Sequence, residues 1–155
     1  MDHVSPTRRS WLMSRVKSKN TAPEMRVRKA AHALGYRFRL HQRHLPGSPD
    51  LVFARLRSVV FVHGCFWHRH PRCGKSSTPT TRKKFWNEKF ARNVARDASV
   101  RQELRRGGWR VCVIWECETK KSSRLVEKLR RFLGSGEAAS LKGTISRRMM
   151  RRKVQ

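Results

Sequence analysis

The segment from His63 to Cys73 reads H-G-C-F-W-H-R-H-P-R-C and concentrates residue types that do chemistry in proteins. It holds thiol and imidazole groups, which bind metals, and an adjacent phenylalanine and tryptophan. Such a segment could bind a metal ion, carry a catalytic centre or grip a partner. The surrounding sequence has to decide among these three.

Cys65, His70 and Cys73 form the pattern C-x4-H-x2-C, whose thiolate and imidazole groups can close around one ion. A tetrahedral zinc site needs a fourth ligand, and Cys112 and Cys117 remain. They stand an odd number of positions apart, so in an extended strand they would point to opposite faces. Cys112 lies inside an apolar strand, whereas Cys117 follows the end of that strand. We therefore predict a closed, structural zinc site completed by Cys117; the alternative is four reduced cysteines buried for packing.

Asp50 follows a proline at the start of a predicted strand, and the next predicted strand ends in Val62 and His63. This outline fits a nuclease site in which a carboxylate and groups from the paired strand hold Mg²⁺ beside a phosphate. An aspartate after a proline is also an ordinary turn residue. Because the zinc site needs neither His63 nor His68, each is available to bind or activate water near the ion.

Phe66 and Trp67 stand between the zinc ligands. Their ordinary role would be to pack under the main sheet; the alternative is a rigid wedge that stacks on bases. Trp86 adds a third large aromatic group, and its ordinary place is the apolar stripe of its own helix. Asp97 interrupts that stripe one turn after Asn93. An inward carboxylate generally has a partner, and an internal salt bridge to an arginine is the ordinary explanation.

A small set of elements must position these residues. Thr21-Ala22-Pro23-Glu24 has the form of a capping box, and apolar residues at helical spacing lead from it to Gly35. Residues 51–54 and 58–62 are predicted to form a β-hairpin. Residues 83–106 are predicted to form a helix with an inward stripe at Trp86, Phe90, Val94, Asp97, Val100 and Leu104.

The C-terminal half continues with a strand over residues 109–115, apolar enough to be buried on both faces, and a helix over residues 123–133. The order of elements predicts an α/β fold with helices flanking a mixed central sheet. A chain of 155 residues suffices for one such domain, which we place at residues 21–134. A basic arm, residues 1–20, precedes it, and a basic tail, residues 135–155, follows.

The charge balance indicates the kind of partner. There are 38 lysines and arginines against 10 acidic residues, a net charge of +28 that is spread along the chain. The resulting positive electrostatic field favours binding to a polyanion. Nucleic acid is the leading candidate partner, because the phosphates that the protein neutralises release their counterions. A membrane partner ranks low, since the apolar runs are too short to span a bilayer and no signal pattern is present. We expect a cytoplasmic monomer, nucleoid-associated if bacterial.

Five segments taken together resemble the very short patch repair endonucleases, which are DNA mismatch nicking enzymes. They are P-D-L-V-F, F-V-H-G-C-F-W-H-R-H, F-W-N-E-K, R-N-V-A-R-D and G-W-R-V-C-V-I-W-E-C, in this order. The resemblance runs from roughly residue 7 to residue 117. It implies a restriction-endonuclease-like fold of the PD-(D/E)XK type, and cleavage of one strand 5′ to the thymine of a T:G mismatch. Such mismatches arise when 5-methylcytosine deaminates.

The resemblance also implies roles for particular residues. Asp50 and the backbone carbonyl of Val62 would bind Mg²⁺, as two ions, and His68 would assist the attacking water. His63 and Glu24 would order metal-bound waters; Asn93 and Asp97, singled out from the helical stripe, are candidates for support. For Glu24 this role competes with the capping box. Other roles follow by position: Phe66, Trp67 and Trp86 would intercalate beside the mismatch, Met13 would enter from the minor groove, and Cys65, His70, Cys73 and Cys117 would bind zinc.

The implied partners are double-stranded DNA with a T:G mismatch and mismatch-repair proteins. One departure concerns the generic nuclease signature, which places an acid and a lysine on the second strand, where this chain has Val62 and His63. Within this family a histidine is expected there, so the departure weakens only a generic nuclease assignment. The alternative function is a zinc-stapled basic protein that binds nucleic acid without chemistry, which would leave Asp50, His63 and His68 without a role.

Overall fold

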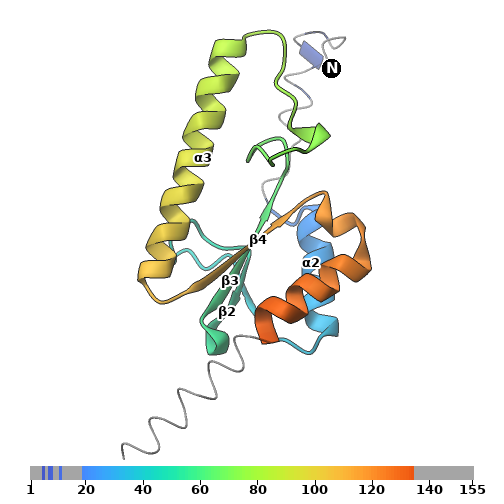
Figure 1. The fold of residues 1–155 in the computed structure, drawn as a ribbon, viewed down its shortest axis with the longest axis vertical. Helices are drawn as coiled ribbons and strands as arrows, with labels where there is room; N and C mark the ends of the chain where they lie inside the picture. The colour runs from blue at the N-terminus through green and yellow to red at the C-terminus, as the bar shows by residue number, and fades with distance from the viewer. Residues whose placement is uncertain (1–4, 6, 9–10, 12–18, 135–155) are drawn as a thin grey trace, which may run out of the picture.

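The computed structural model describes residues 5, 7–8, 11 and 19–134 (Figure 1). Most of the predicted N-terminal arm, including Met13, and the whole predicted tail therefore lie outside the described residues. The elements are α2 (Ala22–Ala33), β1 (Arg39–Leu40), β2 (Leu51–Phe53), β3 (Ser58–His63), α3 (Lys83–Arg106) and β4 (Arg110–Trp115). A C-terminal helix follows over residues 122–134, and short 3-10 turns occupy Ala54–Leu56, Gly74–Ser76 and Glu118–Lys120.

Helix α2 begins and ends where the sequence predicts. The Thr21 side chain accepts a hydrogen bond from the Glu24 amide, and the Glu24 side chain returns to the Thr21 backbone, which completes the capping box. Both contacts satisfy donors that the first helical turn leaves without partners. At the other end Gly35 adopts a φ of +84°, a left-handed conformation that glycine reaches without strain and that stops the helix.

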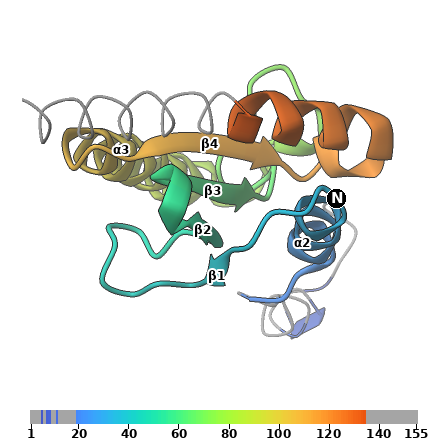
Figure 2. The same ribbon diagram turned by 90° about the horizontal axis from the view of Figure 1, so that it is seen from below.

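The sheet has the order β1-β2-β3-β4, and Figure 2 shows the strands side by side. Strands β1, β2 and β3 are antiparallel, whereas β4 runs parallel to β3 after the long crossover through α3. The predicted hairpin is confirmed, with Leu51 opposite Val60. The sequence prediction missed β1 because a pair of exposed residues carries no alternating pattern. The mixed α/β sheet with flanking helices is as predicted.

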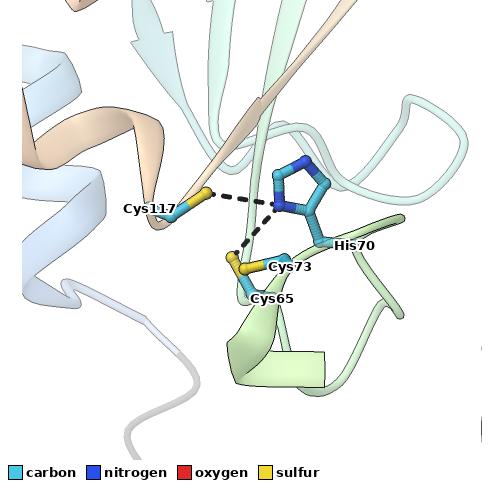
Figure 3. A group of neighbouring side chains, drawn as sticks. All are labelled: Cys65, His70, Cys73 and Cys117. Atoms are coloured by element: carbon cyan, nitrogen blue, oxygen red, sulfur yellow. Dashed lines mark hydrogen bonds between the residues drawn. The ribbon is translucent and has the colours of Figure 1, made fainter. Parts of the chain in front are cut away.

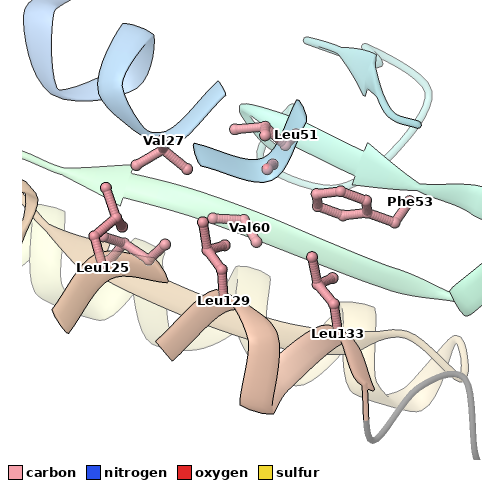
Figure 4. Packing of buried hydrophobic residues seen from close by; sticks show 9 residues of the cluster. Val27, Leu51, Phe53, Val60, Leu125, Leu129 and Leu133 are labelled. Carbon is pink, nitrogen blue, oxygen red and sulfur yellow. The ribbon is translucent and has the colours of Figure 1, made fainter. Parts of the chain in front are cut away.

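Successive side chains of the strands point to opposite faces of the sheet and belong to two hydrophobic clusters, one on each face. On one face α2 and the C-terminal helix pack on β2 and β3 (Figure 4), through Val27, Leu51, Phe53, Val60, Leu125, Leu129 and Leu133. On the other face α3 covers the strands, and Leu104 of α3 joins a second cluster with Leu45, Val52, Val59 and Phe61. The helices thus enclose the sheet from both sides (Figure 1), and this arrangement fixes the strand ends that carry the polar residues.

The prediction holds only in part for β4 and was wrong for Val94. Strand β4 is covered on both faces, but only Ile114 is fully buried, because β4 pairs with one neighbour and stands at the end of the strand order. In α3, Val94 is 43% exposed, so it does not belong to the inward stripe. Asn93, one position earlier, instead reaches inward and donates from its amide to the backbone oxygen of Trp67.

Among the described residues, no helix combines the length and the apolar character needed to cross a lipid bilayer.

Candidate functional site

A cavity of about 890 Å³ opens where the start of α2, the loop before β2, the end of β3 and α3 meet. Its walls include most of the titratable residues singled out from the sequence. Those lining it are Glu24, Asp50, His63, His68 and Asp97, together with His41 and the basic residues Lys19, Arg43, Arg96 and Arg101. The fold therefore brings carboxylates, imidazoles and cations from distant parts of the chain to one hollow.

Asp50 enters the cavity from the start of β2, directly after the buried Pro49. Its Oδ2 accepts a hydrogen bond of 2.7 Å from the backbone amide of Val62, the residue before the end of β3. Burial raises the pKa of Asp50 to about 6, with the negative charge of Glu24 adding to the effect and the Val62 hydrogen bond opposing it. The hairpin pairing of β2 with β3 thus sets the carboxylate beside the end of the neighbouring strand.

His68 and Asp97 form a hydrogen-bonded pair, with 2.5 Å between His68 Nδ1 and Asp97 Oδ2. The predicted arginine partner of Asp97 was wrong, because the inward carboxylate meets the loop after β3 instead. Burial alone would raise the pKa of Asp97, but the hydrogen bond and charge of His68 lower it below its ordinary value. With its Nδ1 held by a carboxylate, the His68 ring is oriented so that Nε2 can accept a proton.

His63 lies against His68 with the two rings nearly parallel, at 14°, and their centroids 3.8 Å apart. Burial lowers the pKa of His63 to about 4, and the neighbouring His68 adds to this effect. The donor atoms of His63, His68 and Asp97 are close enough to surround an ion. However, imidazole lone pairs lie in the ring plane, so two stacked rings do not aim at a common centre. This group is better suited to moving protons and ordering water than to direct coordination of a metal.

Glu24 forms the predicted capping box, and the same carboxylate is part of the cavity wall. The side chain is buried, with 4% of the residue exposed. Its Oε1 accepts a hydrogen bond from the Thr21 hydroxyl at 2.9 Å, and its Oε2 accepts one from the backbone amide of Asn20 at 3.0 Å. Arg28, one turn later in α2, also donates to Oε2 at 3.0 Å.

Cys65, His70, Cys73 and Cys117 form a second group, and their donor atoms all lie within 4.8 Å of one another (Figure 3). His70 Nδ1 lies 3.6 Å from Cys65 Sγ and 3.2 Å from Cys117 Sγ. A tetrahedral zinc ion with bonds of about 2.3 Å to sulfur and 2.0 Å to nitrogen would separate these atoms by roughly 3.6 Å. The donor set and spacing therefore fit zinc. Cys112 lies elsewhere, packed against the core beneath the C-terminal helix.

The surroundings of this cysteine and histidine group hold its loop in shape. The Ser76 hydroxyl lies 2.9 Å from the carbonyl oxygen of Cys65 and 2.8 Å from that of His70, and donates to them. The His70 ring stacks on Trp115, with centroids 4.3 Å apart, at the end of β4. The group thus joins the segment after β3 to the end of the parallel neighbour β4.

An aromatic cluster lies on the other side of the same loop, against the first turns of α3. Phe66 is 5.0 Å from Trp67 and 5.7 Å from Trp86 between ring centroids, so the three predicted intercalating residues meet. Phe90 packs beneath them and is buried, whereas Phe85 beside Trp86 is 43% exposed. Phe66 and Trp67 do not pack under the main sheet. Instead they remain half-buried at the surface.

Sequence reasoning missed two residues of the cavity region. His41 lies between Glu24 and Asp50, with His41 Nε2 3.8 Å from Glu24 Oε2 and His41 Nδ1 3.8 Å from Asp50 Oδ1. Arg28 contacts both Glu24 and His41. The spacing of Glu24 and Arg28, four residues apart in a helix, could have indicated their ion pair. No sequence signal marks His41, which sits in a loop with a φ of +45°.

Comparison with known proteins places this geometry in a family. The family model described as DNA mismatch endonuclease Vsr matches residues 1–75. The DNA mismatch endonuclease Vsr of Escherichia coli K12 is 39% identical over 137 residues, which cover 85% of this chain and 86% of that protein. The chain belongs to the Vsr family of DNA mismatch endonucleases. Its resemblance to very short patch repair endonucleases is thereby confirmed.

Other relatives of the Vsr family match over most of their length. The type II nicking enzyme V.XorIIP of Xanthomonas oryzae pv. oryzae is 48% identical over 132 residues, covering 85% of this chain and 96% of the relative. The type II nicking enzyme V.NmeAIP of Neisseria meningitidis is 39% identical over 132 residues, which cover 85% of this chain and 94% of the relative. Membership of the Vsr family supports a nuclease that acts on DNA, with the restriction-endonuclease-like architecture that the mixed sheet and flanking helices share.

Proposed function

We propose that the protein is a Mg²⁺-dependent endonuclease that nicks one DNA strand 5′ to the thymine of a T:G mismatch and so initiates repair of deaminated 5-methylcytosine. The observation that carries the proposal is the single cavity shared by Asp50, His63 and the His68–Asp97 pair, next to an aromatic cluster. A nucleic-acid-binding protein without chemistry has no use for such a cavity. The names of the nicking relatives support single-strand cleavage.

The cavity residues suit Mg²⁺, a hard cation that prefers oxygen ligands and keeps several waters. Asp50, with its Oδ2 oriented by the Val62 amide, would supply the carboxylate, and by the family resemblance the Val62 carbonyl would supply a backbone oxygen. Glu24 and His63 line the same cavity and would hold metal-bound waters in place. When bound, the ions, two in number by the family resemblance, would neutralise charge on the attacked phosphate and on the leaving oxygen.

His68 acts as the general base. Asp97 holds the proton on His68 Nδ1, so that the Nε2 lone pair accepts a proton from the attacking water. This pairing also stabilises the imidazolium that proton transfer creates. His63 is stacked on His68 and kept neutral by its low pKa, and this contact restricts the orientations that the His68 ring can adopt. The lining cations Lys19, Arg43, Arg96 and Arg101 attract the DNA backbone to the cavity.

Mismatch selectivity comes from the aromatic cluster. Phe66, Trp67 and Trp86 insert beside the mismatch, because a wobble pair costs less to unstack than a matched pair. Lys89 Nζ lies 5.2 Å from the centre of the Trp67 ring and 5.5 Å from that of Trp86, which brings a positive charge to the same surface. Cys65, His70, Cys73 and Cys117 would hold a structural zinc ion that fixes this loop.

The same loop carries both the aromatic residues and His68. Insertion of the aromatic rings beside the mismatch would therefore also place His68 at a fixed distance from the phosphate that is cut. We further propose that the protein acts as a monomer and hands the nicked DNA to mismatch-repair proteins.

The test is an incubation of purified protein and Mg²⁺ with a duplex that carries one T:G mismatch, labelled on each strand in turn. A nick 5′ to the mismatched thymine is expected, and none in the matched T:A duplex. The variant Asp50→Ala should abolish nicking while it retains mismatch binding in a gel-shift assay. Binding without a nick in several flanking sequences would overturn the nuclease proposal in favour of a non-catalytic binding protein.

A further inference from the structure

Asp50 has two carboxylate oxygens, one hydrogen-bonded to the backbone and the other facing a histidine ring. Oδ2 accepts the backbone amide of Val62 at 2.7 Å. Oδ1 faces Nδ1 of His41 at 3.8 Å. A carboxylate that coordinates a metal keeps its geometry through such neighbours, and their loss commonly weakens metal affinity. The contact on the Oδ1 side is provided by a loop residue that has no assigned role.

His41 is itself held in one orientation by Arg28. The Arg28 guanidinium lies 3.0 Å from His41 Nε2, and because a guanidinium can only donate, Nε2 must accept. The ring proton of the neutral imidazole is then on Nδ1, the nitrogen that faces Asp50. The same guanidinium donates to Glu24 Oε2 and to Asn20 Oδ1, at 3.0 and 2.7 Å, so its position is fixed from α2.

The local backbone supports a specific role for His41. Its φ of +45° lies in the left-handed region, which an imidazole-bearing residue occupies at an energetic cost relative to glycine. The side chain is 20% exposed and lines the cavity. The loop therefore accepts backbone strain at the position that turns this ring between the two carboxylates.

We propose that His41, held in one tautomer by Arg28, is a positioning residue that fixes the Oδ1 side of Asp50 for binding of the divalent cation. The inference rests on the proposed function in taking Asp50 as the ligand of that cation. Arg28 and His41 thus connect the capped start of α2 to the carboxylate at the start of β2. One consequence is that the affinity for the cation depends on two residues that need not touch it.

The test measures binding of Mn²⁺, which accepts the same oxygen ligands as Mg²⁺, by the electron paramagnetic resonance signal of the free ion. The purified full-length protein is compared with His41→Ala and His41→Gln, which share the backbone strain at this position. Loss of the ring should weaken Mn²⁺ binding about 10-fold. Glutamine, whose amide can donate to Asp50, should restore most of the affinity. His44→Ala, an exposed histidine of the same loop, should bind Mn²⁺ like the original protein.

A nicking assay gives a second readout. In His41→Ala the Mg²⁺ concentration for half-maximal nicking should rise by the same factor, with little change in the rate at saturating Mg²⁺. Unchanged Mn²⁺ affinity in His41→Ala, alongside a large loss in Asp50→Ala, would overturn the role of His41 alone. Unchanged affinity in Asp50→Ala would overturn the assignment of Asp50 as the metal ligand. A glutamine variant as weak as the alanine variant would overturn the role of an N–H donor facing Asp50.

Discussion

Replacing Asp50 with asparagine should stabilise the metal-free protein at neutral pH. The Asp50 side chain is only 19% exposed, and burial raises its pKa from the ordinary value of 3.8 to about 6. An acid whose pKa is higher in the folded state than in the unfolded state opposes folding once it is ionised. Asparagine has nearly the same shape, and its amide oxygen can still accept the Val62 hydrogen bond. The substitution removes the buried charge and keeps the Val62 hydrogen bond.

The size of the effect follows from the two pKa values. They differ by roughly 2 pH units, and each unit corresponds to about 1.4 kcal/mol, so the ionised carboxylate destabilises the fold by about 3 kcal/mol above pH 6. Below pH 3.8 Asp50 is protonated in both states, and this contribution vanishes. The stability advantage of Asp50→Asn should therefore grow between about pH 4 and pH 6 and then stay level.

The assay is urea unfolding without added divalent cations, at pH 4 and at pH 7.5, followed by tryptophan fluorescence. We expect the free energy of unfolding of Asp50→Asn to exceed that of the original protein by about 3 kcal/mol at pH 7.5, and by less than about 1 kcal/mol at pH 4. Glu88→Gln, which removes an exposed carboxylate from α3, is the control and should change little. Added Mg²⁺ should stabilise the original protein and leave the variant unaffected. An equal advantage at both pH values, or none at pH 7.5, would refute the reasoning.

Three further predictions concern the other parts of the site. Cys117→Ser should lose bound zinc in metal analysis of the purified protein, whereas Cys112→Ser should keep it; retained zinc in the Cys117 variant would show that another ligand closes the site. Trp67→Ala should lower the affinity for T:G duplexes by roughly 10-fold or more in a gel-shift assay, as loss of a stacking aromatic does, and equal losses on matched DNA would contradict a role in mismatch reading. Asp97→Asn should slow nicking by about 100-fold or more, because it removes the carboxylate charge that stabilises the protonated His68 ring, with DNA binding unchanged; a rate near that of the original protein would exclude the proposed general base.

Much of the fold could be predicted because local signals agree with it. The capping box at Thr21 and the glycine after α2 mark the ends of that helix, and the alternating apolar residues of β2 and β3 mark the hairpin. The prediction failed at Val94, where helical spacing alone cannot say where the inward face ends. It also missed β1, whose formation depends on pairing with β2 and not on its own sequence.

The candidate site was predictable where motifs are compact. The cysteine and histidine spacing points to the group that Cys117 joins, and the structure places all four donors together. The partner of Asp97 was not predictable, since contacts between a loop and a helix far along the chain depend on how α3 docks on the sheet. His41 was missed for the same reason, because its neighbours come from α2 and from the start of β2.

The position of the cysteine and histidine group also bears on the order in which the chain folds. Cys65 follows β3 and Cys117 follows β4, and these parallel strands pair only after the whole of α3 has crossed over between them. Contacts that are so distant in sequence close large loops and form slowly. A chain still on the ribosome would hold Asp50, His63 and His68 before it could join Cys117 to the other three donors. The chain therefore lacks the fourth donor of this group until β4 and the residues after it have been made.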